Sequence, residues 1–172
     1  RILLRKPMNH IVSSCIGPDQ TGLVDSLSKI INEHQGNWQV SSLHHLSGFF
    51  AGVIEVAVDE SNCQKLIEAL GKIHGLSCQI EVAETDSSPV KTNLVLELTA
   101  NDRAGIIQEI SSVIHKQGGN LIKLVSSQSS APHTGQLMFN AKVQVAMNEA
   151  ELNELVSALE HIADDLMVDI TC

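Results

Sequence analysis

Asp19-Gln20-Thr21-Gly22 precedes an apolar helical pattern, and the same arrangement returns 83 positions later at Asp102-Arg103-Ala104-Gly105. After each turn, apolar residues recur at positions i, i+1, i+4, i+7 and i+8, a spacing that places them on one face of a helix. These residues are Leu23, Val24, Leu27, Ile30 and Ile31 in the first copy, and Ile106, Ile107, Ile110, Val113 and Ile114 in the second. The chain therefore contains an internal repeat, and each copy has the same turn and amphipathic helix.

Each helical pattern lies within a longer repeated order of elements. A strand-like run precedes the helix, and Gly36 or Gly119 marks its expected end, where glycine can adopt a left-handed conformation. Two more strand-like runs, a second helix and a final strand follow in each copy. The strand-like runs at the two ends of each copy are 10–16 and 76–82, and 93–99 and 166–171. The order βαββαβ predicts an α+β fold of two ferredoxin-like units, each an antiparallel sheet with helices on one face.

The connections between these elements predict the domain boundaries. Ser47-Gly48 predicts a tight two-residue hairpin, and the second copy lengthens this turn by about four residues over 129–135, at an exposed loop tip. The polar segment 83–91 contains Pro89 and predicts a linker. We therefore predict a first domain at 8–82, a linker at 83–91 and a second domain at 92–172.

Composition excludes several classes of function. The 172 residues include 11 Lys and Arg against 20 Asp and Glu, giving a net charge of −9, and there is no Tyr and only one Trp. A protein without a basic patch or stacked aromatic side chains is not expected to bind nucleic acid directly. No apolar run approaches the roughly 18 residues of a membrane span. We expect a cytoplasmic protein that does not enter a membrane.

The histidines and cysteines do not form a recognisable metal or catalytic motif. None of the eight histidines occurs in an H-E-x-x-H pattern, and His44 and His45 should face opposite sides of one strand. We therefore expect no metal, no cofactor and no catalytic residue. The four cysteines form no C-x-x-C pair, so we expect reduced structural thiols. They are Cys15, Cys63, Cys78 and Cys172.

The repeated turn is the most informative candidate site. Asp19 and Asp102 are placed to cap their helices, and Gly22 and Gly105 would leave backbone N–H groups of the first helical turn open to a ligand. Such a helix N-terminus can bind a small carboxylate. The alternative is that the aspartate only caps the helix and the glycine only allows close packing.

The turn and its surroundings resemble a known family. Gly17-Pro18-Asp19-Gln20-Thr21-Gly22-Leu23, the following helix and Gly36-Asn37 are similar to the ACT domain, a βαββαβ module that senses amino acids. Gln117-Gly118-Gly119-Asn120 resembles the same pattern in the second copy, so the resemblance covers about 9–171. Two copies without a catalytic domain most resemble the glycine cleavage system transcriptional repressor family. Thr21 and Ala104 depart from the common pattern, which has proline there, and Asn101 replaces the proline before Asp102.

The resemblance implies a binding site for a small amino acid, such as glycine, between ACT units. In that family the first turn and the neighbouring second strand line the site. Carried over by position, the candidate ligand-binding residues are Asp19, Gln20, Thr21, Gly22 and Leu23, and Asp102, Arg103, Ala104, Gly105 and Ile106. Asn37 and Asn120 are candidates to hold the ligand's ammonium or carboxylate group. Arg103 could pair with a carboxylate, whereas Gln20 could only donate a hydrogen bond to it.

Three functions remain open on the sequence. The first is a non-enzymatic amino-acid sensor that forms a homodimer and controls transcription through a DNA-binding protein partner, such as a transcriptional activator. The second is a ligand-independent module that dimerises by pairing its sheet edges. The third is the detached regulatory part of an enzyme of amino-acid or one-carbon metabolism.

Overall fold

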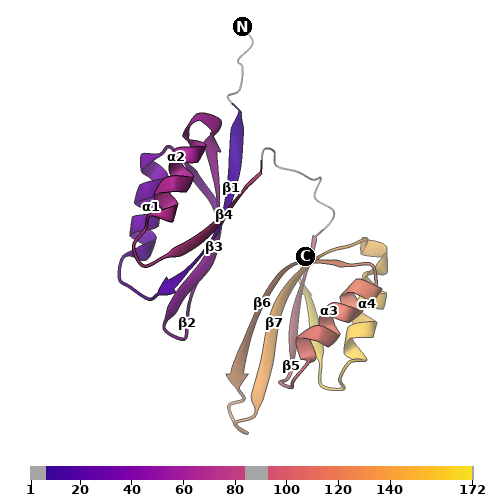
Figure 1. Cartoon of the computed structure of the whole chain (residues 1–172). Coiled ribbons are helices and arrows are strands. Elements are labelled where there is room, and N and C mark those ends of the chain that lie inside the picture. The colour runs from indigo at the N-terminus through magenta and orange to yellow at the C-terminus, as the bar shows by residue number, and fades with distance from the viewer. Residues whose placement is uncertain (1–6, 84–92, 172) are drawn as a thin grey trace. The chain divides into compact units, whose positions relative to one another are not determined.

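The computed structural model describes residues 7–83 and 93–171, which divide into two compact units. Figure 1 shows each unit as a sheet with a pair of helices. Of the predicted linker 83–91, only Ala83 is described, and it ends the last strand of the first unit. The rest of that linker lies outside the described residues, so the boundaries at 82 and 92 stay predictions.

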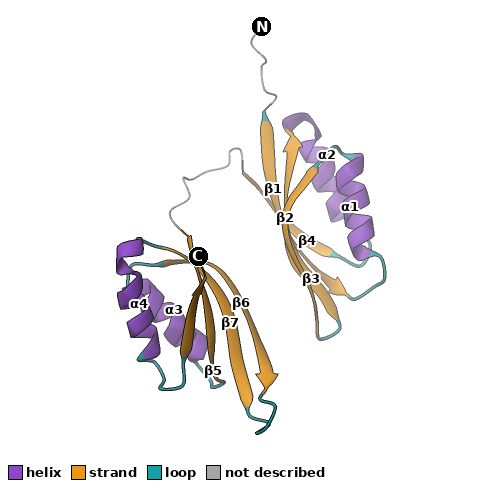
Figure 2. Ribbon diagram, turned by 180° about the vertical axis from the view of Figure 1, so that it is seen from behind, coloured by secondary structure: helices purple, strands orange, loops and turns teal. Residues whose placement is uncertain are grey.

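The first unit follows the predicted order βαββαβ. Its four strands form one antiparallel sheet in the order β2-β3-β1-β4, and helices α1 and α2 cover one face of it (Figure 2). The elements are β1 (Met8–Pro18), α1 (Leu23–Glu33), β2 (Asn37–Leu46), β3 (Phe49–Asp59), α2 (Glu60–Gly71) and β4 (Ser77–Ala83).

The second unit repeats this topology with the sheet order β6-β7-β5-β8. A short 3-10 helix, η1 (Glu149–Glu151), precedes its second helix. The other elements are β5 (Asn93–Asn101), α3 (Ile106–Lys116), β6 (Asn120–Ser130), β7 (Leu137–Ala146), α4 (Leu152–Glu160) and β8 (Met167–Thr171). The two units together confirm the predicted α+β, ferredoxin-like fold.

Each unit has its own hydrophobic core between the sheet and the helices. Leu27 and Leu66 of the helices pack with Ile11 of β1 in the first unit, and Ile110 and Leu155 occupy corresponding places in the second. The predicted apolar face of the first helices is correct except at its i+1 position. Val24 and Ile107 are 45% and 43% exposed, because they lie at the margin of the buried stripe.

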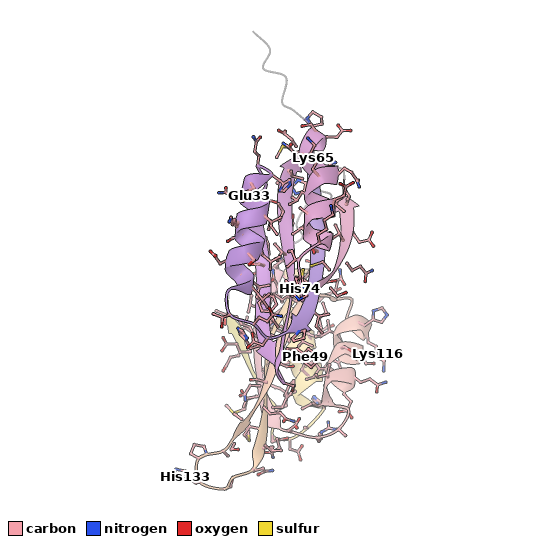
Figure 3. The ribbon with its side chains drawn as sticks, turned by 60° about the vertical axis from the view of Figure 1, so that its left-hand side comes forward. Glu33, Phe49, Lys65, His74, Lys116 and His133 are labelled. Carbon is pink, nitrogen blue, oxygen red and sulfur yellow. The ribbon has the colours of Figure 1, made fainter. Side chains whose placement is uncertain are left out.

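The hairpins and the edge strands carry the local irregularities of the sheets. Ser47 and Gly48 both have positive φ, 50° and 84°, as a two-residue hairpin turn requires. The corresponding loop of the second unit spans 131–136, and Figure 3 shows His133 at its tip. A β-bulge interrupts the edge strand β2 between Trp38 and Val40 and recurs in β6, between 121 and 123.

The helix ends correct one prediction. Gly36 and Gly119 are not left-handed, because the chain leaves each helix one residue earlier, at Gln35 with φ 58° and Gly118 with φ 80°. The two following glycines serve packing instead. A Cβ on Gly36 would lie 2.9 Å from Val56 Cγ1, and one on Gly119 would lie equally close to a valine of β7. A side chain at either position would collide with the core.

Candidate functional site

The turn between β1 and α1 is fixed by backbone hydrogen bonds and one left-handed glycine. The Asp19 N–H donates to the Gly48 carbonyl at 3.0 Å, which ties the turn to the β2–β3 hairpin. Gly22 has φ 85° and is the N-cap of α1, and the Ser26 N–H donates to its carbonyl at 3.0 Å. Among the described residues no side chain caps this helix. The N–H groups of its first turn therefore remain available to a ligand.

The second unit builds the same turn from different side chains. The Asp102 N–H donates to the Leu137 carbonyl at 2.9 Å, and Gly105 is the left-handed N-cap of α3 with φ 85°. The Glu109 N–H donates to the Gly105 carbonyl at 3.1 Å. Within the described chain this helix also begins without a side-chain cap. The backbone geometry of the turn is thus the repeated feature.

The predicted capping role of Asp19 and Asp102 is wrong. Each aspartate stands three residues before the N-cap, and its carboxylate contacts the second strand of its unit instead of the helix. Asp19 Oδ1 lies 3.0 Å from His45 Nδ1, and Asp102 Oδ2 accepts a hydrogen bond from Gln128 Nε2. Both partners come from the edge strand that neighbours the turn.

Close packing does not explain the two glycines of the turn. A Cβ built on Gly22 or on Gly105 meets no described atom within 4 Å. Both positions need glycine because an L side chain is strained at a φ of 85°. The glycine therefore sets the direction of the turn, and the space in front of the helix N-terminus stays open.

A pocket of about 380 Å³ lies over the turn of the first unit. All five residues predicted there, from Asp19 to Leu23, line this pocket. Val24, exposed on α1, and Asp25 extend it along the helix, and His45 and Phe50 form its other wall. The His45 ring packs edge-on against Phe50, with ring centroids 5.9 Å apart.

The second unit has a corresponding pocket of about 500 Å³. Its predicted residues, 102–106, all line it, together with the exposed Ile107 and Gln108 of α3. Ser126, Ser127 and Gln128 of β6 and Phe139 of β7 complete the lining. An aspartate, a helix N-terminus and a phenylalanine are therefore common to both pockets.

Arg103 distinguishes the second pocket. Both terminal nitrogens of its guanidinium bind the Glu109 carboxylate, in the first turn of α3. This hydrogen-bonded pairing raises the pKa of Arg103 and lowers the pKa of Glu109. A ligand carboxylate that approached Arg103 would have to compete with Glu109 for the guanidinium.

Asn37 and Asn120 lie far from the pockets of their own units. Asn37 pairs with Ala57, which pairs with His10, whereas the turn follows Pro18 at the other end of β1. Eight residues of strand span about 26 Å at roughly 3.3 Å per residue. In Figure 3, Glu33, at the end of α1, and Phe49, at the hairpin, lie toward opposite ends of the first unit. The second unit is arranged alike, so neither asparagine lines a pocket with its own turn.

The pocket residues on the second and third strands were not predicted from the sequence to bind a ligand. They are His45 and Phe50 in the first unit, and Ser126, Ser127, Gln128 and Phe139 in the second. In the first unit a signal was present, because a two-residue turn at Ser47-Gly48 places His45 directly opposite Phe50. In the second unit the longer loop does not show which residues of the two strands face each other, so the same inference could not be made.

The described residues contain no group of three or more His, Cys, Asp or Glu side chains that could hold a metal ion. His44 and His45 have separate partners, since His44 Nε2 contacts Ser42 Oγ at 2.9 Å while His45 contacts Asp19. No helix in the described part of the chain is long and apolar enough to cross a membrane.

This chain resembles known proteins in its structure. No family model and no curated protein matches the sequence. A crystal structure of an unknown protein from Galdieria sulphuraria is similar to this chain with a TM-score of 0.78 and 24% identity, covering 95% of this chain and 97% of that one. A "putative glycine cleavage system transcriptional repressor" is similar with a TM-score of 0.69 and 16% identity, covering 95% and 98%.

The chain therefore shares its overall fold, two βαββαβ units in tandem, with these two solved proteins. The likeness extends over nearly the whole length of both solved proteins. This tandem fold places the same strand–turn–helix connection in each unit, and the connection lines each of the two turn pockets.

Proposed function

We propose that this protein is a non-enzymatic regulator that binds a small amino acid in the turn pockets. The observation that carries the proposal is the pairing, in both pockets, of an aspartate with an uncapped helix N-terminus. An amino acid carries a carboxylate, which a helix N-terminus attracts, and an ammonium group, which an aspartate attracts. Each pocket therefore offers a partner for both charged groups of the ligand.

The walls of the pockets favour a ligand with a small side chain. Val24 presents apolar surface in the first pocket and Ile107 in the second, whereas Phe50 and Phe139, 2% and 3% exposed, lie beneath the lining. The space is open rather than enclosed, so the charged ends of the ligand supply most of the affinity. Glycine consists of little more than these two groups. The name of one similar solved protein, which mentions the glycine cleavage system, supports glycine as the first ligand to test.

The output of the sensor is contact with another protein. The net charge of −9 disfavours direct contact with DNA, so a role in transcription requires a DNA-binding protein partner, such as a transcriptional activator. We propose that the regulator acts as a homodimer in the cytoplasm. The ligand changes this association only if it binds the free and partner-bound states with unequal affinity.

Glycine binding to the full chain tests the proposal by calorimetry and by thermal unfolding. At 100 times its dissociation constant a ligand adds about 2.7 kcal/mol to stability. Asp102→Asn should weaken binding at the second pocket about 10- to 150-fold, because a hydrogen bond to a charged group contributes about 1.5–3 kcal/mol. Asp169→Asn makes the same charge change on β8, outside the pocket, and should leave binding unchanged.

The nineteen other amino acids should be tested beside glycine. If none of the twenty shifts the unfolding midpoint, the sensor function is refuted. The pocket assignment is refuted if Asp102→Asn and Asp169→Asn bind the ligand equally well.

The open face of the first sheet favours a second candidate, a ligand-independent dimerisation module. Val12 and Val40 flank Glu55 in one row across this face, and Val53 lies two residues along β3. All three valines are exposed on the side away from the helices. Light scattering distinguishes the two functions, since the module would form dimers whose dissociation constant does not change with glycine.

A further inference from the structure

Two cysteines of the first unit lie in direct contact. Cys15 on β1 is the register partner of Cys78 on β4, and their Sγ atoms are 2.7 Å apart. Cys15 is 3% exposed, whereas Cys78 is only partly buried beside the core. The buried Ser13 hydroxyl lies 3.4 Å from Cys15 Sγ. A hydroxyl and two thiols therefore meet on the side of the sheet that the helices cover.

The second unit shows that packing does not require these polar atoms. Leu96 and Leu98 occupy the places of Ser13 and Cys15, 83 positions later, and Leu98 is the register partner of Val168. All three residues belong to the second core or pack against it. The same site in the fold is thus filled by hydrocarbon in one unit and by reactive sulfur in the other.

We propose that Cys15 and Cys78 are a modification site, a thiol pair that a peroxide converts to a reversible disulfide. The sulfurs are already within about 0.7 Å of the roughly 2.05 Å length of a disulfide bond. Facing residues of neighbouring antiparallel strands have Cα atoms about 4.5–5.5 Å apart, within the range of natural disulfides. Thiolates on a tetrahedral zinc ion would lie about 3.7 Å apart, so the contact favours a covalent bond over a bridging metal.

The reaction balances with peroxide as the only oxidant. One sulfur, as thiolate, attacks a peroxide oxygen; the O–O bond breaks, and the departing hydroxide takes a proton to form water. The second sulfur then attacks the resulting sulfenic acid, the S–O bond breaks, and the S–O oxygen leaves as a second water. The two thiols lose two electrons and two protons in total. The reverse step is reduction by a thiol such as dithiothreitol.

The contact between Cys15 and Cys78 also favours oxidation, because it changes the pKa values of the two thiols. The hydrogen bond from Cys78 lowers the pKa of Cys15 to about 7, while the pKa of Cys78 is raised by the same contact and by burial. A thiolate is therefore present in the pair near neutral pH, and the thiolate is the form that attacks peroxide. Cys78 is the more exposed of the two sulfurs, so peroxide reaches the pair from the β4 edge.

Peptide mapping of the full chain tests the proposal independently of amino-acid binding. The native protein is treated with hydrogen peroxide, quenched with iodoacetamide, digested, and analysed by mass spectrometry. We expect a peptide pair joined through Cys15 and Cys78, about 2 Da lighter than the reduced pair and released by dithiothreitol. Cys63, buried in α2, is the internal reference and should be alkylated only after unfolding.

Matched variants identify the bond. Cys78→Val installs the residue found at that place in the second unit and should abolish the joined peptide, whereas Cys63→Ala should preserve it. The proposal is overturned if Cys15 and Cys78 remain free in the peroxide-treated native protein, or if either one pairs with another cysteine. The map of the natural chain decides between these results even if Cys78→Val fails to fold.

Discussion

Replacing Gly22 by alanine should destabilise the first unit although the new methyl group meets no atom. Gly22 has φ 85°, and a Cβ there would have no described neighbour within 4 Å. Gly71, at the end of α2, has the same empty surroundings, but its φ is not positive. Alanine at the two positions therefore differs in backbone conformation alone, which makes Gly71→Ala the matched control.

The two substitutions should change the free energy of unfolding in opposite directions. A left-handed L residue costs roughly 1–2 kcal/mol. Alanine also restricts the unfolded chain, which stabilises the protein by about 0.4–1 kcal/mol wherever the backbone tolerates it. Gly22→Ala should therefore lower the free energy of unfolding by about 1 kcal/mol, which lowers the unfolding midpoint by roughly 4–8 °C for a unit of this size. Gly71→Ala should raise the midpoint by a few degrees.

Tryptophan fluorescence measures the first unit selectively. Trp38 is the only tryptophan of the chain, and it packs against the first core. Thermal unfolding of both variants should be followed by this signal beside the unaltered protein. An equal rise in midpoint for Gly22→Ala and Gly71→Ala would refute the left-handed N-cap and, with it, the geometry of the pocket.

Three other substitutions or conditions give separate tests. Gln35→Gly should raise the fluorescence midpoint of the first unit slightly, because the left-handed strain that it relieves, roughly 1–2 kcal/mol, exceeds the roughly 0.4–1 kcal/mol by which glycine loosens the unfolded chain; a lower midpoint would contradict this. Gly119→Ala should destabilise the second unit by about 1–3 kcal/mol in urea, since its Cβ would lie 2.9 Å from Val145 Cγ1. An unchanged urea midpoint would show that the core around residue 119 can rearrange to accept the added methyl group. The initial rate of disulfide formation between Cys15 and Cys78 should rise as the pH increases through about 7 and then level off, because deprotonation of Cys15 supplies the thiolate. A rate that does not depend on pH would exclude that thiolate as the attacking group.

The fold could be predicted from the sequence because three independent signals repeat together. The helical spacing from Leu23 returns at Ile106, and the glycines after each helix return at the same interval. A turn, a helical face and a helix end all recur at this interval, so the chain must contain two copies of the same unit. The short connections between elements then restrict the topology of each copy. The left-handed residue before Gly36 was missed because sequence alone does not show that Gln35 adopts this conformation.

Only the part of the site that is continuous in sequence was predicted. Each predicted turn residue lines its pocket, because the turn is a continuous segment. The pairing of Asp19 with His45 depends on strand register, which places a residue 26 positions away beside the turn. The contact between Cys15 and Cys78 joins residues 63 positions apart across β1 and β4. Such contacts follow from the sheet order, which no local pattern in the chain encodes.

The repeated bulge in β2 and β6 bears on how the chain avoids aggregation. An edge strand offers unpaired backbone groups to any extended chain that meets it, and a regular edge can template fibril growth. Because the bulge breaks the spacing of these groups after Trp38 and after Leu121, an incoming strand can follow only part of each edge. Lys123 directly follows the second bulge and adds a charge that a stacked copy would have to bury. These two edges are therefore poorer templates for an added strand than a regular edge would be.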